Sequence, residues 1–278
     1  MKLGAVFPAS FGGDPILIRD FVQTVEGLAY DYILIYEQII ESPSETVLAW
    51  PESLMVLSYI ASLTHKLELA TGIVVLPSRQ TVLVAKQVAQ LDRLAGGRLR
   101  FGVSAGWNEV EYQAMGVPYA HRGRRLDEQV SLLKQLWSQE SVTFQGEFHH
   151  LEAVSIFPQP VQTSIPIWFG GHTDRVLERI ARLGDGWMAV ATEYATPVTL
   201  PARLDKLRQY CEEVGRNFND IGLEIVDVRP TEARDWPQWV QKWCDLGATH
   251  LDIATRDQGL TTPQQHMEAM RKFKEAVG

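Results

Sequence analysis

Eight short apolar runs, separated by stretches with helical spacing, constrain the fold of this chain more than any other feature. The runs cover residues 3–7, 32–36, 67–76, 99–104, 165–169, 187–191, 223–228 and 251–254. Short apolar runs bounded by proline or glycine are typical of buried strands. Strands that alternate with helices predict a parallel sheet covered by helices on its outer face.

A closed barrel is favoured over an open doubly wound sheet. The chain has 278 residues, and a (β/α)8 barrel typically needs about 250. An open sheet that binds dinucleotides would carry GxGxxG after its first strand, but here Pro8 follows and removes a backbone donor. No P-loop is present either. We therefore predict an α/β protein, a single (β/α)8 TIM barrel over residues 1–278.

The interval between the fourth and fifth runs is too long for one crossover helix. It contains a helical pattern that ends near Trp137, followed by VTFQGEFHHLE, which alternates around Gln145 and Gly146. Such alternation predicts a β-hairpin. We expect residues 107–164 to form an insertion of a helix and a hairpin on the barrel rim, with His149 and His150 at the surface instead of binding metal.

Composition excludes several classes of function. The formal net charge of −8 argues against a nucleic-acid partner, which needs a concentrated basic surface. Cys211 and Cys244 are too few for a disulfide framework and lack metal-ligand spacing, so no metal is expected. The first residues carry no cleavable apolar segment, and no run approaches 18 apolar residues. These features predict a soluble, cytoplasmic protein without a membrane partner.

In a TIM barrel the functional residues lie at the carboxyl ends of the strands. After the fifth run, Gly170 and Gly171 precede His172, Thr173 and Asp174 at the start of a helical pattern. Glycines let a ligand approach the backbone, and the free amides of a helix start attract anions. The same residues are also compatible with an ordinary turn in which Thr173 or Asp174 caps the helix.

Two further strand ends carry similar signals. After the fourth run, Gly106 can adopt backbone angles that other residues avoid, Trp107 offers a flat aromatic face, and Asn108 is of a type that caps helices. Within the third run, Gly72 interrupts a β-branched strand. An isolated glycine there indicates a bulge or a close backbone approach, although a kink at a barrel corner explains it equally well.

The stretch TGIVVLPSRQTVLVAKQVAQLDRLAGGRLRFGVSAGWNEVEYQAMGVPYAHRGRRLDEQ resembles the luciferase-like monooxygenase superfamily. Within that superfamily it is most similar to the branch of F420-dependent oxidoreductases. The segments GEF, FPQPVQTSIPIWFGG and RLGDGW continue the likeness in the same order.

The resemblance implies a barrel that holds a flat tricyclic cofactor over its carboxyl-terminal mouth. Members use FMN with oxygen, or the deazaflavin coenzyme F420, which transfers a hydride. The resemblance also implies a cis peptide bond at Gly72–Ile73 and a cofactor phosphate on the loops after the fourth and fifth strands. The cofactor-binding residues it implies are Thr71, Gly72, Ile73, Ala105, Gly106, Trp107, Asn108, Gly170, Gly171, His172 and Thr173.

One departure from the pattern lies at the end of the second strand. Deazaflavin-using relatives commonly carry Asp-His there, where this chain has Glu37 and Gln38. Gln38 cannot exchange a proton near neutral pH, whereas Glu37 could if burial raised its pKa. Glu37, Gln38 and His172 are therefore the catalytic candidates, with His172 a possible substitute for the missing histidine.

These features support three hypotheses about function. The first is hydride transfer between coenzyme F420 and a small organic substrate; the basic residues Arg122, Arg124 and Arg125 would suit the acidic tail of that coenzyme. The second is an FMN-dependent monooxygenase that uses oxygen. The third is a cofactor-binding protein with lost or altered catalysis, which the Glu37-Gln38 pair motivates. The resemblance further implies a homodimer.

Overall fold

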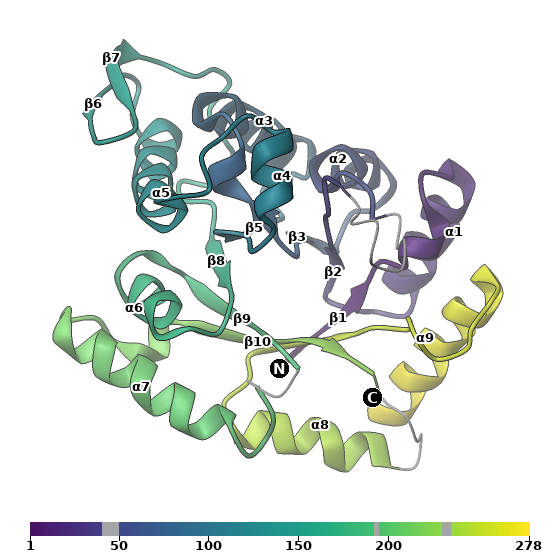
Figure 1. Cartoon of the computed structure of the whole chain (residues 1–278). Coiled ribbons are helices and arrows are strands. Elements are labelled where there is room, and N and C mark those ends of the chain that lie inside the picture. Colours follow the sequence, from purple (N-terminus) through teal and green to yellow (C-terminus); the bar gives the residue numbers. More distant parts are fainter. Residues whose placement is uncertain (41–49, 192–194, 230–234) are drawn as a thin grey trace.

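The fold is a closed barrel of eight parallel strands, seen in a computed structural model that describes residues 1–40, 50–191, 195–229 and 235–278 (Figure 1). The barrel strands are β1 (Lys2–Val6), β2 (Tyr32–Ile35), β3 (Glu68–Thr71), β5 (Leu99–Ser104), β8 (Ile167–Gly170), β9 (Gly186–Val190), β10 (Gly222–Val228) and β11 (His250–Ile253). Pairing of β1 with β11 and of β3 with β5 closes the barrel. The predicted (β/α)8 architecture is thus confirmed.

A ring of helices covers the outside of the barrel (Figure 1). Its members are α1 (Pro15–Gly27), α2 (Ser53–Leu63), α3 (Thr81–Leu94), α5 (Arg122–Ser138), α6 (Asp174–Leu183), α7 (Leu200–Glu213), α8 (Trp236–Asp245) and α9 (Pro263–Val277). Short 3-10 turns occur at η1 (Ala9–Phe11), η2 (Leu76–Ser78) and η3 (Phe218–Asp220). Among the described residues, none of the helices has the length and apolar character needed to cross a bilayer.

The segment between β5 and β8 differs in part from the expected insertion. It contains α4 (Glu109–Ala114), α5 and an antiparallel pair, β6 (Val142–Gln145) and β7 (His150–Val154). Helix α5 packs between α3 and α6, because its apolar side buries Leu126, Val130 and Leu133. It is therefore one of the barrel helices, and α4 and the hairpin are the added elements.

His149 lies in a more buried position than the sequence indicated. Its Nδ1 atom is 2.7 Å from a carboxylate oxygen of Glu128 on α5, and its Nε2 atom is 2.6 Å from the hydroxyl of Thr81 on α3. Glu128 also accepts hydrogen bonds from the backbone N–H groups of Glu147 and Phe148. The expectation of a surface position is wrong for His149, whose contacts fix the hairpin to two barrel helices, whereas His150 is exposed as expected.

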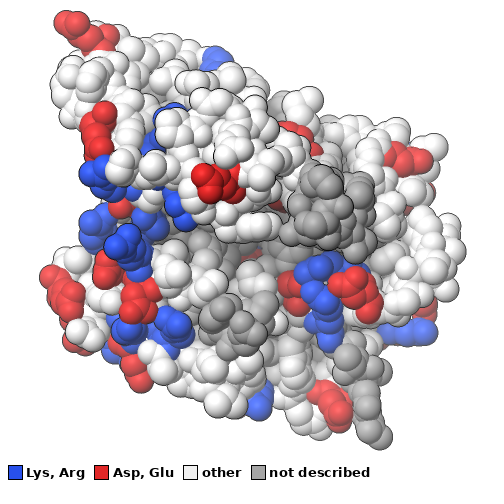
Figure 2. Space-filling model, in the orientation of Figure 1, with Lys and Arg blue, Asp and Glu red and all other residues white. Residues whose placement is uncertain are grey.

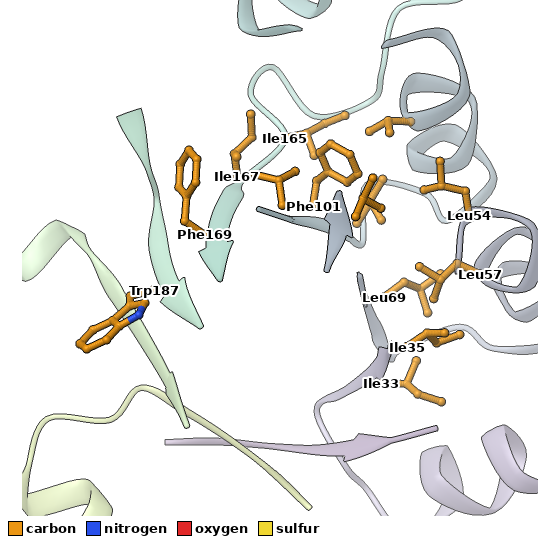
Figure 3. Close-up of a cluster of buried hydrophobic side chains, with 14 of the residues drawn as sticks. Ile33, Ile35, Leu54, Leu57, Leu69, Phe101, Ile165, Ile167, Phe169 and Trp187 are labelled. Atoms are coloured by element: carbon orange, nitrogen blue, oxygen red, sulfur yellow. The ribbon is translucent and has the colours of Figure 1, made fainter. Parts of the chain in front are cut away.

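The apolar core is divided by the strands into an outer and an inner part. On the outer side Leu69 points toward Leu57 of α2, with Ile35 and Ile33 below it in the same cluster (Figure 3). The inner cluster fills the barrel with alternate residues of the strands: Val6, Tyr32, Leu34, Ala70, Trp168, Met188, Val226 and Ala254. Alternation of the side chains along each strand separates the two parts.

A buried charge cluster lies among these inner residues. Arg100, which is 3% exposed, forms two hydrogen bonds to the fully buried carboxylate of Glu224, at 2.5 and 3.1 Å. Its Nε atom donates to Glu68 at 2.5 Å. The guanidinium carbon also lies 4.9 Å from the ring centroid of Tyr32 and 4.4 Å from that of Trp168. The charge of Arg100 is therefore neutralised by carboxylates and enclosed by aromatic rings.

Glycines on neighbouring strands leave room for these rings. A Cβ atom at Gly4 would lie 2.2 Å from the ring of Tyr32, and one at Gly186 would lie 2.2 Å from the ring of Trp168. Both distances are far shorter than any van der Waals contact. The two glycines are therefore required by the width of the aromatic side chains inside the barrel.

Arg100→Met leaves the buried Glu224 carboxylate without its cation, and Glu224→Gln leaves the buried Arg100 with the partly exposed Glu68 as its one remaining carboxylate among the described residues. We expect the free energy of unfolding to fall by about 3–5 kcal/mol in either variant. Lys2→Met is the control, because Lys2 bonds to Glu68 of the same cluster at 2.7 Å but is half exposed. Lys2→Met should lower the free energy of unfolding by less than about 1 kcal/mol. Denaturant unfolding measures all three, and equal losses would contradict a dominant inner pair.

Candidate functional site

A cavity of 770 Å³ opens at the carboxyl ends of the barrel strands. Its walls come from the ends of β2, β5, β8 and β9 and from the first turns of α4, α5 and α6. Figure 2 shows the hollow near the centre of this face. This is the end of a TIM barrel at which functional residues are expected.

Nearly all residues singled out in the sequence lie around this one cavity. The lining residues among them are Glu37, Gln38, Gly72, Ile73, Ala105, Gly106, Trp107, Asn108, Gly170, Gly171, His172 and Thr173. Thr71 does not line it. Its fully buried hydroxyl accepts a hydrogen bond from the N–H of Gly102 and donates one to the carbonyl of the same residue, both at 2.8 Å. Thr71 therefore joins β3 to β5 instead of facing a ligand.

The third strand is interrupted at Gly72, where the sequence indicated a bulge, a close backbone approach or a kink at a barrel corner. β3 ends at Thr71 and β4 (Val74–Val75) continues beside β5. The peptide bond between Gly72 and Ile73 is cis, as the resemblance implied. Ile73 lies partly exposed in the cavity wall, beside Gly170 of β8. The interruption thus forms an apolar shelf at the barrel mouth.

The floor of the cavity is formed by residues from inside the barrel. Met188 and Val226 of the inner cluster, and Tyr36, which packs against that cluster, line the cavity. The hydroxyl of Tyr36 is buried and has no hydrogen-bond partner among the described residues. Burial raises the pKa of this hydroxyl well above its usual value, so it stays protonated. The floor is therefore uncharged and largely apolar.

One end of the cavity is suited to an anion. Gly171 has φ of 123° and leads into Thr173, which precedes α6 and places no side-chain hydrogen bond on the helix amides. Asp174, the first residue of α6, pairs with Arg203 at 2.9 Å. The N–H groups at the start of a helix bind anions through their partial positive charge.

Arginines surround the same end of the cavity. The Nε of Arg122 donates to the carbonyl of Gly106 at 3.2 Å, and Arg179 is held by Asp127. Arg124 pairs at 3.0 Å with an exposed glutamate, and Arg175 forms no ion pair within the described ranges. All four line the cavity, and Figure 2 shows basic side chains gathered at one side of the hollow. Glu147 and Asp127 offset the charges of Arg124 and Arg179, so the excess positive charge at this end comes from Arg122 and Arg175.

Glu37 is held by contacts on both carboxylate oxygens. One oxygen lies 2.6 Å from Nη2 of Arg79, and the other accepts hydrogen bonds from the N–H and hydroxyl of Ser53, at 3.0 and 2.7 Å. The side chain is only 2% exposed. Gln38 donates to the carbonyl of Ile40 at 3.0 Å. This geometry favours a role for Glu37 in joining β2 to α2 over the proton exchange that the sequence suggested.

Glu111 is a site residue that the sequence analysis missed. It lies in the first turn of α4, is 5% exposed and lines the cavity. Its Oε1 atom is buried without a hydrogen-bond partner among the described residues. Burial raises the pKa of Glu111, and the nearby Glu37 carboxylate raises it further, whereas the Ile39 N–H and Arg79 lower it. A glutamate at a helix start is usually explained by the helix dipole, so its sequence position gave no signal.

The cavity fits an elongated ligand with a flat apolar body and a phosphate. The shelf at Gly72–Ile73 and the floor around Tyr36 offer apolar contact area, and the start of α6 offers free amides. Within the described ranges, no group of three His, Cys, Asp or Glu residues is arranged to hold a metal. The residues present therefore fit a flavin or a deazaflavin.

Known proteins resemble the chain in sequence and in fold. A sequence model of the family described as luciferase-like monooxygenase matches residues 13–271. An uncharacterized protein of Mycobacterium tuberculosis is 30% identical over 214 residues, which are 76% of this chain and 71% of that protein. An F420-dependent glucose-6-phosphate dehydrogenase of Kineococcus radiotolerans is 32% identical over 211 residues, or 72% and 60% of the two chains.

A likeness to solved structures extends over the whole fold. The crystal structure of monooxygenase RslO1 from Streptomyces bottropensis has a TM-score of 0.81 at 18% identity and covers 100% of this chain and 98% of the other. At this identity the likeness shows the barrel fold alone.

Gly106→Ala tests whether the backbone at the cavity wall must be free of a side chain. Gly106 has φ of 64°, and a Cβ there would lie 2.6 Å from Val75 in the wall. Gly116→Ala is a matched control, because Gly116 has φ of 67° but no atom within 4 Å of the added carbon. Both should lose about 1–2 kcal/mol of stability.

We expect only Gly106→Ala to weaken cofactor binding as well, by displacing Val75 into the cavity. Thermal unfolding and cofactor titration measure the two effects. Equal cofactor affinity in the two variants would show that this wall is not part of the binding site.

Proposed function

This chain belongs to the luciferase-like monooxygenase family, and from that membership we propose that it transfers a hydride between coenzyme F420 and a small organic substrate. The observation that carries the proposal is the positive end of the cavity, where Arg122, Arg124 and Arg175 adjoin the start of α6. An acidic oligoglutamate tail gains from such a field, whereas FMN, with one phosphate, needs only the helix amides.

The proposed site assigns distinct tasks to the cavity walls. The shelf at Gly72–Ile73 and the floor around Tyr36 would hold the ring, and Gly171 to Thr173 would hold the phosphate. When bound, the deazaflavin supplies the hydride acceptor or donor. The protein supplies orientation and an apolar surface that excludes water from the reacting carbon.

The similarity to the Kineococcus radiotolerans enzyme supports this choice of cofactor. That protein is an F420-dependent dehydrogenase, and its match covers 72% of this chain. The expected cytoplasmic location and homodimeric assembly remain predictions.

An FMN-dependent monooxygenase is the second candidate. The description of the family as luciferase-like monooxygenases favours it. The third candidate, a cofactor-binding protein with altered or lost catalysis, rests on Glu37 and Gln38 in place of Asp-His. Reactivity with oxygen distinguishes the second candidate, and bound cofactor without turnover distinguishes the third.

Parallel titrations of the purified protein with F420 and with FMN test the proposal. We expect tight binding of F420 and much weaker binding of FMN. The variant Arg124→Gln/Arg175→Gln should weaken F420 binding by about tenfold, because two exposed charges contribute roughly 0.5–1 kcal/mol each. Its effect on FMN should be smaller. Tight binding of FMN alone would overturn the proposal in favour of the monooxygenase.

A further inference from the structure

Two buried polar atoms beneath the cavity floor have no hydrogen-bond partner among the described residues. They are the hydroxyl oxygen of Tyr36 and the Oδ2 atom of Asp252. Asp252 lies in β11 and is fully buried, and its other oxygen, Oδ1, accepts a hydrogen bond from the N–H of Asp227 at 2.7 Å. Buried polar atoms are nearly always paired with the protein or with ordered water, because an unpaired one costs folding free energy.

The strand register brings a third buried hydroxyl, that of Tyr32, toward Asp252. Both residues are in register with Gly4 of β1, with Tyr32 on one side of it and Asp252 on the other. The ring of Tyr32 lies across Gly4, since a Cβ atom there would be 2.2 Å from Cζ, the ring carbon that bears the hydroxyl. The ring therefore extends from β2 across β1, toward Asp252.

Tyr36 approaches Asp252 from the cavity side. It follows β2 and packs against the inner cluster, four residues after Tyr32. Burial raises the pKa of its hydroxyl, and the charge of Asp252 has the next largest effect in the same direction, as expected for neighbouring groups. On β11 the next inner residue after Asp252 is Ala254, whose methyl group occupies little space. The three polar groups thus gather in one part of the barrel interior.

We propose that Tyr32, Tyr36 and Asp252 bind one internal water molecule beneath the cavity floor. A metal ion is disfavoured there, because Arg100 already supplies a positive charge to this interior and the described residues hold no group of three metal ligands. A buried water typically makes about three hydrogen bonds, which is the number these side chains offer. The site lies below the cavity and is independent of the cofactor that the cavity holds.

Each side chain has a defined part in this hydrogen bonding. Burial, followed by the Glu224 carboxylate, raises the pKa of Asp252 well above its usual value, which favours the protonated carboxyl group. Because Oδ1 accepts from the N–H of Asp227, the proton lies on Oδ2, which donates it to the water. The hydroxyl of Tyr32 bonds to Glu224, so its oxygen accepts from the water. The oxygen of Tyr36 accepts the second hydrogen of the water.

The water connects the cavity floor to the ion pair inside the barrel. Its bond to Tyr36 holds a ring that lines the cavity, and its bond to Tyr32 leads through Glu224 to Arg100. The hydroxyl of Tyr36 is thereby held among buried groups, and the ring itself is what the floor presents to a ligand.

Tyr36→Phe, with Tyr30→Phe as a matched control, tests the water site through the melting temperature of the cofactor-free protein. The hydroxyl of Tyr30 is also buried, and it donates to the carbonyl of Met270 at 2.9 Å. We expect both variants to melt at a lower temperature than wild type, because each loses a hydrogen bond and leaves its partner unpaired. If Tyr36→Phe melts at or above the wild-type temperature, its hydroxyl has no partner and the site does not exist.

Asp252→Leu tests whether Tyr36 and Asp252 share the same water. Leucine has the shape of aspartic acid without its polar atoms, so we expect the water to leave. In this background Tyr36→Phe should no longer lower the melting temperature, whereas Tyr30→Phe should lower it as much as in the wild-type background. The same loss for Tyr36→Phe in both backgrounds would overturn the shared site.

A high-resolution crystal structure of the wild-type protein without cofactor gives a direct readout that needs no variant to fold. We expect one electron-density peak within hydrogen-bonding distance of Oδ2 of Asp252 and of the hydroxyls of Tyr32 and Tyr36. A direct hydrogen bond between Tyr36 and Asp252, or the absence of such a peak, would contradict the proposal.

Discussion

The ion pair between Arg100 and Glu224 inside the barrel is the interaction on which the rest of the structure depends. Eight parallel strands enclose a space that side chains must fill, and here a charged pair stands where most barrels place aliphatic residues. The pair is enclosed by the rings of Tyr32 and Trp168. Burial, and then the charge of Arg100, lower the pKa of the adjacent His250 to about 3, so this ring adds no second positive charge.

This filled interior gives the cavity its floor. Tyr32, Leu34 and Tyr36 alternate inward along β2 and its carboxyl end, so the inner layers lead from the ion pair up to the cavity. A ligand at the mouth therefore rests on packed side chains and not on an open channel. The polar groups of the cavity come from the loops and helix starts above this packed floor, as the barrel architecture favours.

Much of the fold and part of the site were predictable from sequence, for a physical reason. Strands and the Gly170-Gly171 turn leave local signals, since apolar runs and glycines reflect the backbone around them. No local signal in the sequence marked the places of Glu111 and Arg175 in the cavity wall or the ion pair of Glu37 with Arg79. These features depend on which distant elements meet at the mouth of the barrel. The same limit explains why the sequence misplaced Thr71 and α5. The hydroxyl of Thr71 bonds to the backbone of Gly102 in β5, and the place of α5 in the helix ring follows from its contacts with α3 and α6.

The measurement that tests the central claim most directly is a crystal structure of the protein grown with coenzyme F420. We expect the deazaflavin ring against Gly72–Ile73, with the phosphate at the backbone N–H groups of residues 171–173 and the acidic tail toward Arg124 and Arg175. A ring bound elsewhere, or a phosphate that does not contact the start of α6, would contradict it.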